Sequence, residues 1–178
     1  MTQPQHRTLS IAQKLAVRAY TLLMRAEGMW ALPVRRYLVG LIVGRRLEYV
    51  NIFPDVFIEG WQGLQIANNV SLNRGCNLSC FGGVAIGEHV SIGHCCSIIS
   101  TNHGFSDPAV PIRMQPSSYA PVSIGNDVWL GAKVTVLAGV AIASGTVVAA
   151  GSVVARSIEQ ADSVVVGIPA KRLKSRFD

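Results

Sequence analysis

Histidine is the side chain in this sequence that is best suited to proton transfer near neutral pH. Because its imidazole titrates close to pH 7, it can remove the proton of a hydroxyl group as the oxygen attacks an electrophile. The chain has four histidines, His6, His89, His94 and His103. His103 ends the segment Ile98–His103, just before the longest irregular stretch of the sequence. Functional side chains are common where a rigid element meets a long loop, so we expect His103 to be a general base.

The element that must position His103 is a six-residue repeat. Neither a helix, with a period near 3.6 residues, nor a half-buried strand, with a period of 2, produces a hydrophobic period of six residues. An aliphatic residue recurs at every sixth position between Ser123 and Val154, and the same register continues upstream. The residues in this first position are Ile66, Leu72, Leu78, Ile86, Ile92, Ile98, Ile124, Leu130, Val136, Ile142, Val148 and Val154.

We interpret each repeat as one short strand plus a corner, so that three repeats wind into a triangular coil. First-position side chains would fill its axis, and each would contribute roughly 1.5 to 3 kcal/mol through burial. The fifth position is small or β-branched, as a tight corner requires. An extra pair near Gly83–Val84 and an excursion from Gly104 to about Val122 break the register. The repeat predicts about five coils of a parallel β-helix between Ile52 and Val154, with one protruding loop.

Charge is concentrated in the N-terminal arm. Residues 1–47 carry eight basic side chains and one acidic one, whereas residues 48–178 carry eight basic and nine acidic ones. The net charge of +6 therefore describes the arm and not the repeat body. Since no basic stripe with interleaved aromatics runs through the body, we expect no nucleic-acid partner.

The arm is expected to be helical. Ser10 is the predicted N-cap of a helix whose apolar residues Ile11, Leu15, Ala19, Leu22, Leu23 and Ala26 share one face. A second helical piece follows Pro33, and its apolar run Leu38–Val43 is too short to cross a bilayer, which takes about 20 residues. One interpretation is a helical cap on the repeat body. The other is a basic amphipathic anchor on an anionic membrane surface.

Four cysteines, Cys76, Cys80, Cys95 and Cys96, do not have the spacing of a disulfide scaffold. Cys76 and Cys96 occupy fifth positions of the repeat, so we expect small buried thiols there, with a metal site as the alternative. No signal-peptide pattern is present at the N-terminus. We therefore expect a cytoplasmic location, with the inner face of the membrane as the variant that the basic arm favours.

Four segments accompany the repeat: STNHGFSDPAVPIRMQ, PVSIGNDVWLGAKV, VVAAGSVV and VVGIPAKRLKSR. With the period of six, they resemble the left-handed β-helix acyltransferases of the hexapeptide-repeat class, in particular the galactoside, maltose and capsule or O-antigen sugar O-acetyltransferases. The resemblance covers residues 66–176 and implies a mainly β fold, a left-handed parallel β-helix with an N-terminal helical segment, an extended loop and a short C-terminal helix. The left-handed sense comes from the resemblance alone, because parallel crossovers are otherwise right-handed.

The resemblance implies an acetyl-CoA-dependent O-acetyltransferase that forms a homotrimer and needs no metal. His103 would deprotonate a hydroxyl of a sugar or a lipid-linked glycan precursor in a ternary complex, without an acyl-enzyme. Ala155 and Arg156 replace a Thr-Lys pair of the family, which keeps the charge and loses a hydroxyl. The implied coenzyme-binding residues are Ala132, Ala150, Ala155, Arg156, Lys171 and Lys174, and the implied substrate-binding residues are Asn77, Asn102 and Trp129.

Simpler roles stand beside these assignments: corner packing for the alanines, a solvated helix face for Lys171 and Lys174, and a subunit seam for Trp129. The family's substrate-polarising asparagine aligns with Gly75, which leaves Asn73, Asn77 or the backbone for that role. Glu27 is the only acid of the arm, so no acceptor-binding acid of the family has a match. The acceptor and its hydroxyl therefore do not carry over.

Three other functions fit parts of the pattern. One is nucleotide-sugar N-acetyltransferase, which differs only in the acceptor group. Another is a γ-class carbonic anhydrase-like metal enzyme, for which His89 and His94 would be zinc ligands. The third is a β-helix scaffold without catalysis, which would not need His103, the loop and the basic C-terminal segment together. The expected organisation is a helical arm at 1–50, the β-helix at 51–157 with loop 104–122, and a C-terminal segment at 158–178.

Overall fold

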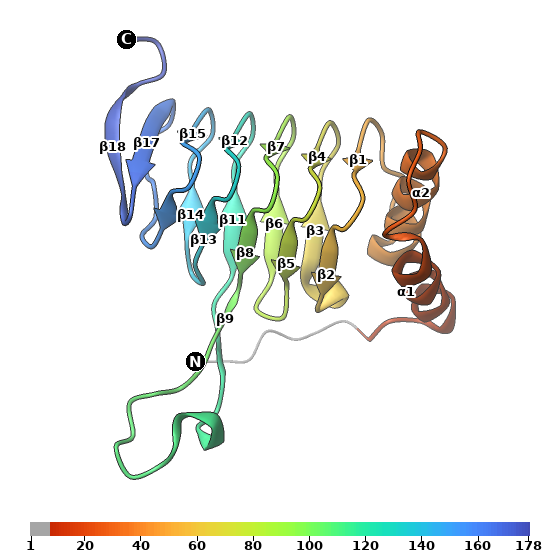
Figure 1. Cartoon of the computed structure of the whole chain (residues 1–178), viewed down its shortest axis with the longest axis horizontal. Coiled ribbons are helices and arrows are strands. Elements are labelled where there is room, and N and C mark those ends of the chain that lie inside the picture. The colour runs from red at the N-terminus through yellow and green to blue at the C-terminus, as the bar shows by residue number, and fades with distance from the viewer. Residues whose placement is uncertain (1–7) are drawn as a thin grey trace.

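The computed structural model describes residues 8–178, so His6 and Arg7 lie outside the described part. Two helices, α1 (Ile11–Leu23) and α2 (Ala31–Val43), cover one end of a column of short strands (Figure 1). A C-terminal hairpin lies at the opposite end, and one long loop leaves the column near its middle. The column therefore separates the helical arm from the C-terminus.

Three sheets form the walls of the column, and we name them faces A, B and C in the order in which the chain meets them. Every inter-strand pair within a wall is parallel, except for the last pair of face A. We name the corners between the walls the AB, BC and CA edges. Face A contains β1 (Asn51–Ile52), β4 (Ser71–Leu72), β7 (Ser91–Ile92), β12 (Trp129–Leu130), β15 (Val147–Val148), β17 (Ser163–Gly167) and β18 (Ala170–Ser175); face B contains β2 (Phe57–Glu59), β5 (Asn77–Ser79), β8 (Ser97–Ile99), β13 (Thr135–Val136) and β16 (Val153–Val154); face C contains β3 (Leu64–Ile66), β6 (Val84–Ile86), β11 (Val122–Ile124) and β14 (Ala141–Ile142).

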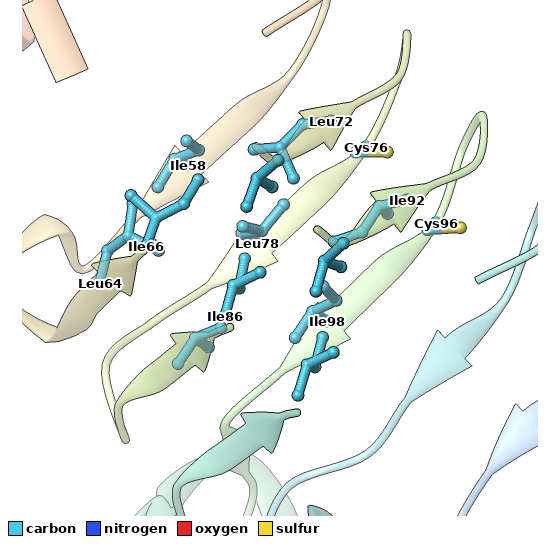
Figure 2. Packing of buried hydrophobic residues seen from close by; sticks show 14 of the residues in the cluster. Ile58, Leu64, Ile66, Leu72, Cys76, Leu78, Ile86, Ile92, Cys96 and Ile98 are labelled. Carbon is cyan, nitrogen blue, oxygen red and sulfur yellow. The ribbon is translucent and has the colours of Figure 1, made fainter. Parts of the chain in front are cut away.

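The first-position side chains fill the axis of the column, as the repeat predicts. None of these twelve residues is more than 4% exposed. Figure 2 shows the isoleucine and leucine side chains of successive coils stacked inside the walls, with Cys76 and Cys96 above one another at a corner. This continuous apolar core holds the walls together.

The corners turn at the fourth position of the repeat, where the backbone is left-handed. At the CA edge Asn69, His89 and Asp127 have φ values of 57°, 59° and 53°. Asparagine, aspartate and glycine tolerate this conformation best. The corner geometry also explains why the fifth position that follows is small and buried, because it points straight into the angle between two walls.

Face A has six parallel rungs, so the column has five coils and the first side of a sixth. The expected column of about five coils, ending at Val154, therefore stops too early. An isolated bridge between Ile142 and Ile158 completes the fifth coil on face C. Val164 and Val165 of β17 then pair with Val147 and Val148 without keeping the six-residue spacing, which is why the repeat did not reveal this rung.

The predicted short C-terminal helix is wrong. Residues 163–175 form an antiparallel hairpin of β17 and β18, and Lys171 and Lys174 lie on β18. The last rung of a parallel wall presents unpaired backbone N–H and C=O groups. Val164, Val165 and Val166 are β-branched and favour a strand, which pairs with these groups. The next strand, β18, then pairs with the new edge.

All departures from the period between the first three coils lie on the BC edge. Ile58 and Ile66, and likewise Leu78 and Ile86, are eight residues apart instead of six. In the next coil the whole excursion lies between Ile98 and Ile124 on this same edge. The two breaks that the sequence showed separately are therefore neighbours in space.

The loop is held at its base and inside its tip. At its base, β9 (Thr101–Asn102) pairs antiparallel with β10 (Ser118–Tyr119). Inside it, a short 3₁₀ turn, η2 (Ile112–Met114), leads to the buried side chain of Gln115. The Gln115 amide accepts a hydrogen bond from Asp107 N (3.1 Å) and donates to the carbonyl oxygens of Asp107 (2.9 Å) and Val110 (2.8 Å). One amide side chain thus closes the loop on itself.

Helix α1 begins at the predicted N-cap, Ser10, which forms a capping box with Gln13. The buried side of α1 is formed by Gln13, Ala16 and Tyr20. Gln13 Nε2 donates to the carbonyl oxygen of Ile42 (2.8 Å), and Tyr20 Oη donates to that of Val56 (2.7 Å). Tyr20 also packs edge-on against Trp61 of η1 (Trp61–Gly63), with ring centroids 5.0 Å apart. These contacts fix α1 to α2 and to the first coil.

The apolar side of α1 that the sequence predicted faces away from the column. Ile11, Leu15 and Leu22 are 80%, 57% and 84% exposed. Helix α2 likewise buries Arg35, Val39 and Ile42 and leaves its other side open. The arm therefore packs on the first coil, as a cap would, but its largest aliphatic stripe has no partner in the described chain.

Arg35 joins the arm to the column without a carboxylate partner. Its side chain is fully buried, Nε donates to the carbonyl oxygen of Ile52 (2.6 Å), and Nη1 donates to those of Ala26 (2.8 Å) and Leu23 (3.4 Å). Burial lowers the pKa of the guanidinium. The carbonyl groups that it binds end α1 and begin the column, so one cation satisfies acceptors from both.

We predict that Arg35→Met lowers the free energy of unfolding by about 3 kcal/mol, because buried carbonyl groups lose charge-assisted hydrogen bonds. The control is Arg36→Met, one residue on and only half-buried, which should change stability by less than about 0.5 kcal/mol. Urea unfolding followed by circular dichroism measures both. Equal midpoints for the two variants would contradict the role given to Arg35.

We predict that Gln115→Ala opens the loop without melting the column. Loss of three hydrogen bonds, each worth about 1 kcal/mol, should raise amide exchange and protease cleavage within 104–117 at least tenfold. Hydrogen–deuterium exchange with peptide mapping locates the change, and Gln65→Ala, an exposed glutamine on face C, is the matched control. Unchanged amide exchange in the loop would show that the Gln115 hydrogen bonds do not hold it closed.

Candidate active site

The BC edge of the third coil is where the column departs most from regular structure, and His103 lies there. Asn102 pairs with Ser118 on one side of His103, and Gly104 N donates to the carbonyl oxygen of Pro116 (3.0 Å) on the other. The backbone is therefore fixed on both sides of an exposed side chain. The His103 imidazole makes no hydrogen bond within residues 8–178, so both ring nitrogens are open to a substrate.

Buried hydrogen bonds of Ser100, three residues before His103, fix the backbone where the loop leaves the column. Ser100 is fully buried, its Oγ donates to the carbonyl oxygen of Ser79 (2.6 Å), and it accepts from Gly82 N (2.8 Å). A Cβ on Gly82 would collide with the Ser100 carbonyl oxygen and lie 2.9 Å from Ala120 N. Only glycine fits there. Sequence reasoning missed Ser100 and Gly82, because these residues are 18 positions apart in the chain and meet only when consecutive coils stack.

Two of the expected coenzyme-binding residues share the BC edge with His103. Ala155 and Arg156 follow β16, which pairs with β13, and β13 pairs with β8, the strand that leads to His103. They are exposed, two rungs from the His103 coil, or about 10 Å along the column. Arg156 therefore brings a positive charge to the same edge as the imidazole.

Three others lie on the AB edge. Gly151 N donates to the carbonyl oxygen of Ala132 (2.8 Å), and a Cβ on Gly131 would approach Ala150 N within 2.6 Å, so these coils stack closely through small residues. The turn between β17 and β18 reaches the same edge, because Gly167 N donates to Ser152 Oγ (3.1 Å). Lys171 is paired with Val166 beside this turn. Ala132, Ala150 and Lys171 therefore follow one edge.

The remaining expected residues are dispersed. Asn77 is exposed at the start of β5, toward the AB edge, and its partner in register is Ser97, not His103. Lys174 pairs with Val164 at the other end of β18. Asn102 alone lies beside His103. In one copy of the chain, face B separates the AB-edge residues from the BC-edge residues.

Trp129 lies on face A, where it is 56% exposed. It lines a shallow hollow of about 410 Å³ together with His89, Ser91, Asp127, Val147 and Arg176. Arg176 Nη1 donates to Asp127 Oδ2 (2.7 Å), which closes one side of the hollow. Within one chain, Trp129 and His103 are on different parts of the column.

Three of the cysteines are buried and Cys95 is exposed, and His89 and His94 lie at edges of the column away from the His103 loop. Cys76 and Cys96 are fully buried, as predicted, and their Sγ atoms contact the carbonyl oxygens of Gly93 and Gly131 at 3.1 Å. Burial raises the pKa of the Cys80 thiol to about 12. His89 is an exposed corner residue, and His94 is exposed on the AB edge. Within residues 8–178, no group of three histidine, cysteine or acidic side chains is placed to hold a metal ion.

Comparison with known proteins agrees with this architecture. The family described as bacterial transferase hexapeptide (six repeats) matches residues 121–156. A probable acetyltransferase of Mycobacterium tuberculosis is 34% identical over 140 residues, which are 78% of this chain and 45% of that protein. The putative lipopolysaccharide biosynthesis O-acetyl transferase WbbJ of Escherichia coli is 37% identical over 115 residues, 61% of this chain and 58% of that protein. The chain thus spans about half the length of these relatives.

Among solved structures, a hexapeptide-repeat acetyltransferase from Vibrio cholerae, complexed with acetyl coenzyme A, superposes with a TM-score of 0.79 at 25% identity. The match covers 92% of this chain and 87% of that one. This coverage is much larger than residues 121–156, which the family description matches. The repeat, the fold and these comparisons together show that the chain has the left-handed parallel β-helix of the hexapeptide-repeat acyltransferases, and that residues 121–156 match the hexapeptide family itself.

Proposed function

We propose that this protein is an acetyl-CoA-dependent O-acetyltransferase that acetylates a hydroxyl of a sugar or of a lipid-linked glycan precursor. The observation that carries the proposal is the exposed His103 imidazole, fixed by its backbone at the one edge where a loop leaves the column. The similar proteins named as acetyltransferases, and the neighbour bound to acetyl coenzyme A, support the reaction and the donor.

The reaction needs a base because a neutral hydroxyl is a poor nucleophile. The neutral His103 imidazole accepts the hydroxyl proton while the oxygen attacks the thioester carbonyl carbon, and a C–O bond forms. When the C–S bond breaks, the imidazolium returns the proton to the departing sulfur. One histidine thus serves both half-steps, so acceptor and donor react in a ternary complex and no acyl-enzyme forms. Asn102, exposed beside His103, is placed to contact the acceptor.

The separation of the two edges supports an active site between copies. Ala132, Ala150 and Lys171 follow the AB edge, whereas His103, Ala155 and Arg156 follow the BC edge. A site that uses both sets needs the AB edge of one copy against the BC edge of another. This is a heterologous contact, and such contacts form a ring when the rotation between copies closes. In a homotrimer the ring has three equal sites.

Each edge has properties that suit part of a coenzyme A molecule. The stacked small residues of the AB edge leave room for a narrow pantetheine arm beside exposed backbone groups. Lys171 on one edge and Arg156 on the other supply positive charge for the phosphates. Asn77, near the AB edge, and Trp129, on face A, complete the proposed substrate contacts from the neighbouring copy.

We predict that His103→Ala lowers turnover by about 10² to 10⁴, the usual contribution of a general base. The dissociation constant for coenzyme A should stay within about threefold, because the base does not hold the donor. Acetyl-CoA consumption with a panel of sugars and glycan precursors measures the first, and isothermal titration the second. Gln65→Ala, an exposed side chain on face C away from both edges of the proposed site, is the control with full activity.

Full activity of the His103 variant would reject the assignment of His103 as the base. Turnover with amino sugars alone would reject the hydroxyl acceptor and indicate an N-acetyltransferase.

We predict that two inactive variants complement each other when their subunits are mixed. In His103→Ala the BC half of the site is lost, and in Ala150→Trp the AB half is blocked. Random mixing in a trimer should restore about one quarter of the wild-type activity, because a quarter of the sites receive both intact halves. Refolding or co-expression of the two chains, with each alone as control, tests this. A mixture as inactive as its components would show that the site lies within one copy.

A further inference from the structure

The outer surface of the helical arm combines exposed apolar side chains with unpaired positive charge. We define the outer arm face as the residues of α1 and α2, and of the loop after α2, that lie opposite the sides buried on the first coil. The apolar members are Ile11, Leu15 and Leu22 on α1 and Tyr37 and Leu41 on α2. Their exposed fractions run from 45% for Leu41 to 84% for Leu22. Exposed apolar side chains that gather on one surface mark a site of contact with a protein or a membrane.

The inward contacts show that this exposure is not an accident of loose packing. The opposite side of α1 is tied to α2 and to the column by Gln13 and Tyr20, and that of α2 by Arg35. Both helices are therefore held in one layer at the end of the column, and Figure 1 shows no other segment of residues 8–178 beyond them. A broad surface can approach this layer without meeting the column or the loop.

Positive charge lies among these apolar side chains. Lys14 and Arg18 lie on the exposed side of α1, and Arg36 lies on α2; none of the three has an acidic partner within residues 8–178. The two acids of the region are already engaged: Glu27 with Arg74 (2.7 Å) and Glu48 with Arg46 (3.7 Å). The face therefore has an uncompensated positive field.

A groove on α2 adds depth to this surface. It has a volume of about 810 Å³ and runs between the outer side of α2 and the loop that follows it. Gly40, Leu41 and Leu47 line its apolar part. Three arginines, Arg36, Arg45 and Arg46, also line the groove, and Glu48 pairs with Arg46, so the rim keeps a net positive charge from the other two. An apolar floor with a basic rim matches an anionic lipid, whose chain is apolar and whose phosphate is negative.

The geometry points to the outer arm face as a docking surface for an anionic lipid bilayer. The exposed aliphatic and tyrosine side chains would enter the headgroup region, and lysines and arginines would bind lipid phosphates. Neither helix is long and apolar enough to cross a bilayer, so the contact is peripheral. Docking would hold the column end-on to the membrane. The proposal does not depend on the acetyltransferase activity, and its test needs no substrate.

The test is co-sedimentation of the full chain with large unilamellar vesicles of phosphatidylcholine, with and without 30% phosphatidylglycerol, a composition that mimics an anionic surface. We expect binding to the anionic vesicles that weakens as salt rises. In Lys14→Glu/Arg18→Glu the partition coefficient should fall at least about 25-fold, since each basic residue contributes about fivefold. Leu15→Ser/Leu22→Ser should weaken binding without changing its salt dependence.

The matched control is Arg113→Glu, which reverses an exposed charge on the protruding loop and should bind like the wild type. Equal binding to neutral vesicles, or no loss in the arm variants, would overturn the proposal. So would a change in the oligomeric state of the arm variants without lipid, measured by light scattering, because the face would then be a contact between copies. Circular dichroism checks that each variant is folded.

Discussion

The whole structure depends on one packing constraint: every wall of every coil must place its first-position aliphatic side chain in the narrow axis of the column. Because the walls are flat and the axis is narrow, six residues are needed to place the next such side chain around the corner. If a repeat has more than six residues, the additional ones have no space inside the column and must project outward at an edge. The constraint thus explains both the uniform core and the concentration of the extra residues on the BC edge, where His103 lies.

Buried polar side chains mark the places where this regular packing meets something else. Arg35 joins the helical arm to the first coil, and Ser100 sits where the long loop leaves the third. At both places the ladder of parallel strands stops and leaves carbonyl groups that need donors. Inside the loop, the Gln115 side chain likewise donates to a backbone carbonyl group, that of Asp107. The column is held by apolar contacts, but its attachments are held by a few hydrogen bonds.

A column that exposes three edges and two ends can serve different contacts at once. The edges carry the residues of the proposed active site, divided between AB and BC, so that catalysis would depend on assembly. The end with the helices presents an apolar and basic layer that takes no part in these edges. Membrane contact and catalysis would then use separate surfaces of the same rigid body. A lipid-linked acceptor would connect them, because docking at the membrane would bring the active site close to that acceptor.

The sequence by itself determined the β-helix, its buried positions, the loop and the N-cap at Ser10, because each depends on spacing along the chain or on local hydrogen bonds. The candidate base was identifiable for the same reason. The tertiary structure decided what depends on a neighbour: residues 163–175 form a hairpin because the last rung offered an unpaired edge, and α1 turned its polar side inward because Gln13 and Tyr20 found carbonyl acceptors there. It also decided that the breaks share one edge, and that five of the six expected coenzyme-binding residues are divided between two edges while Lys174 lies apart from both. The period gives the spacing along the chain, but it does not give the distances between residues on different walls of a coil.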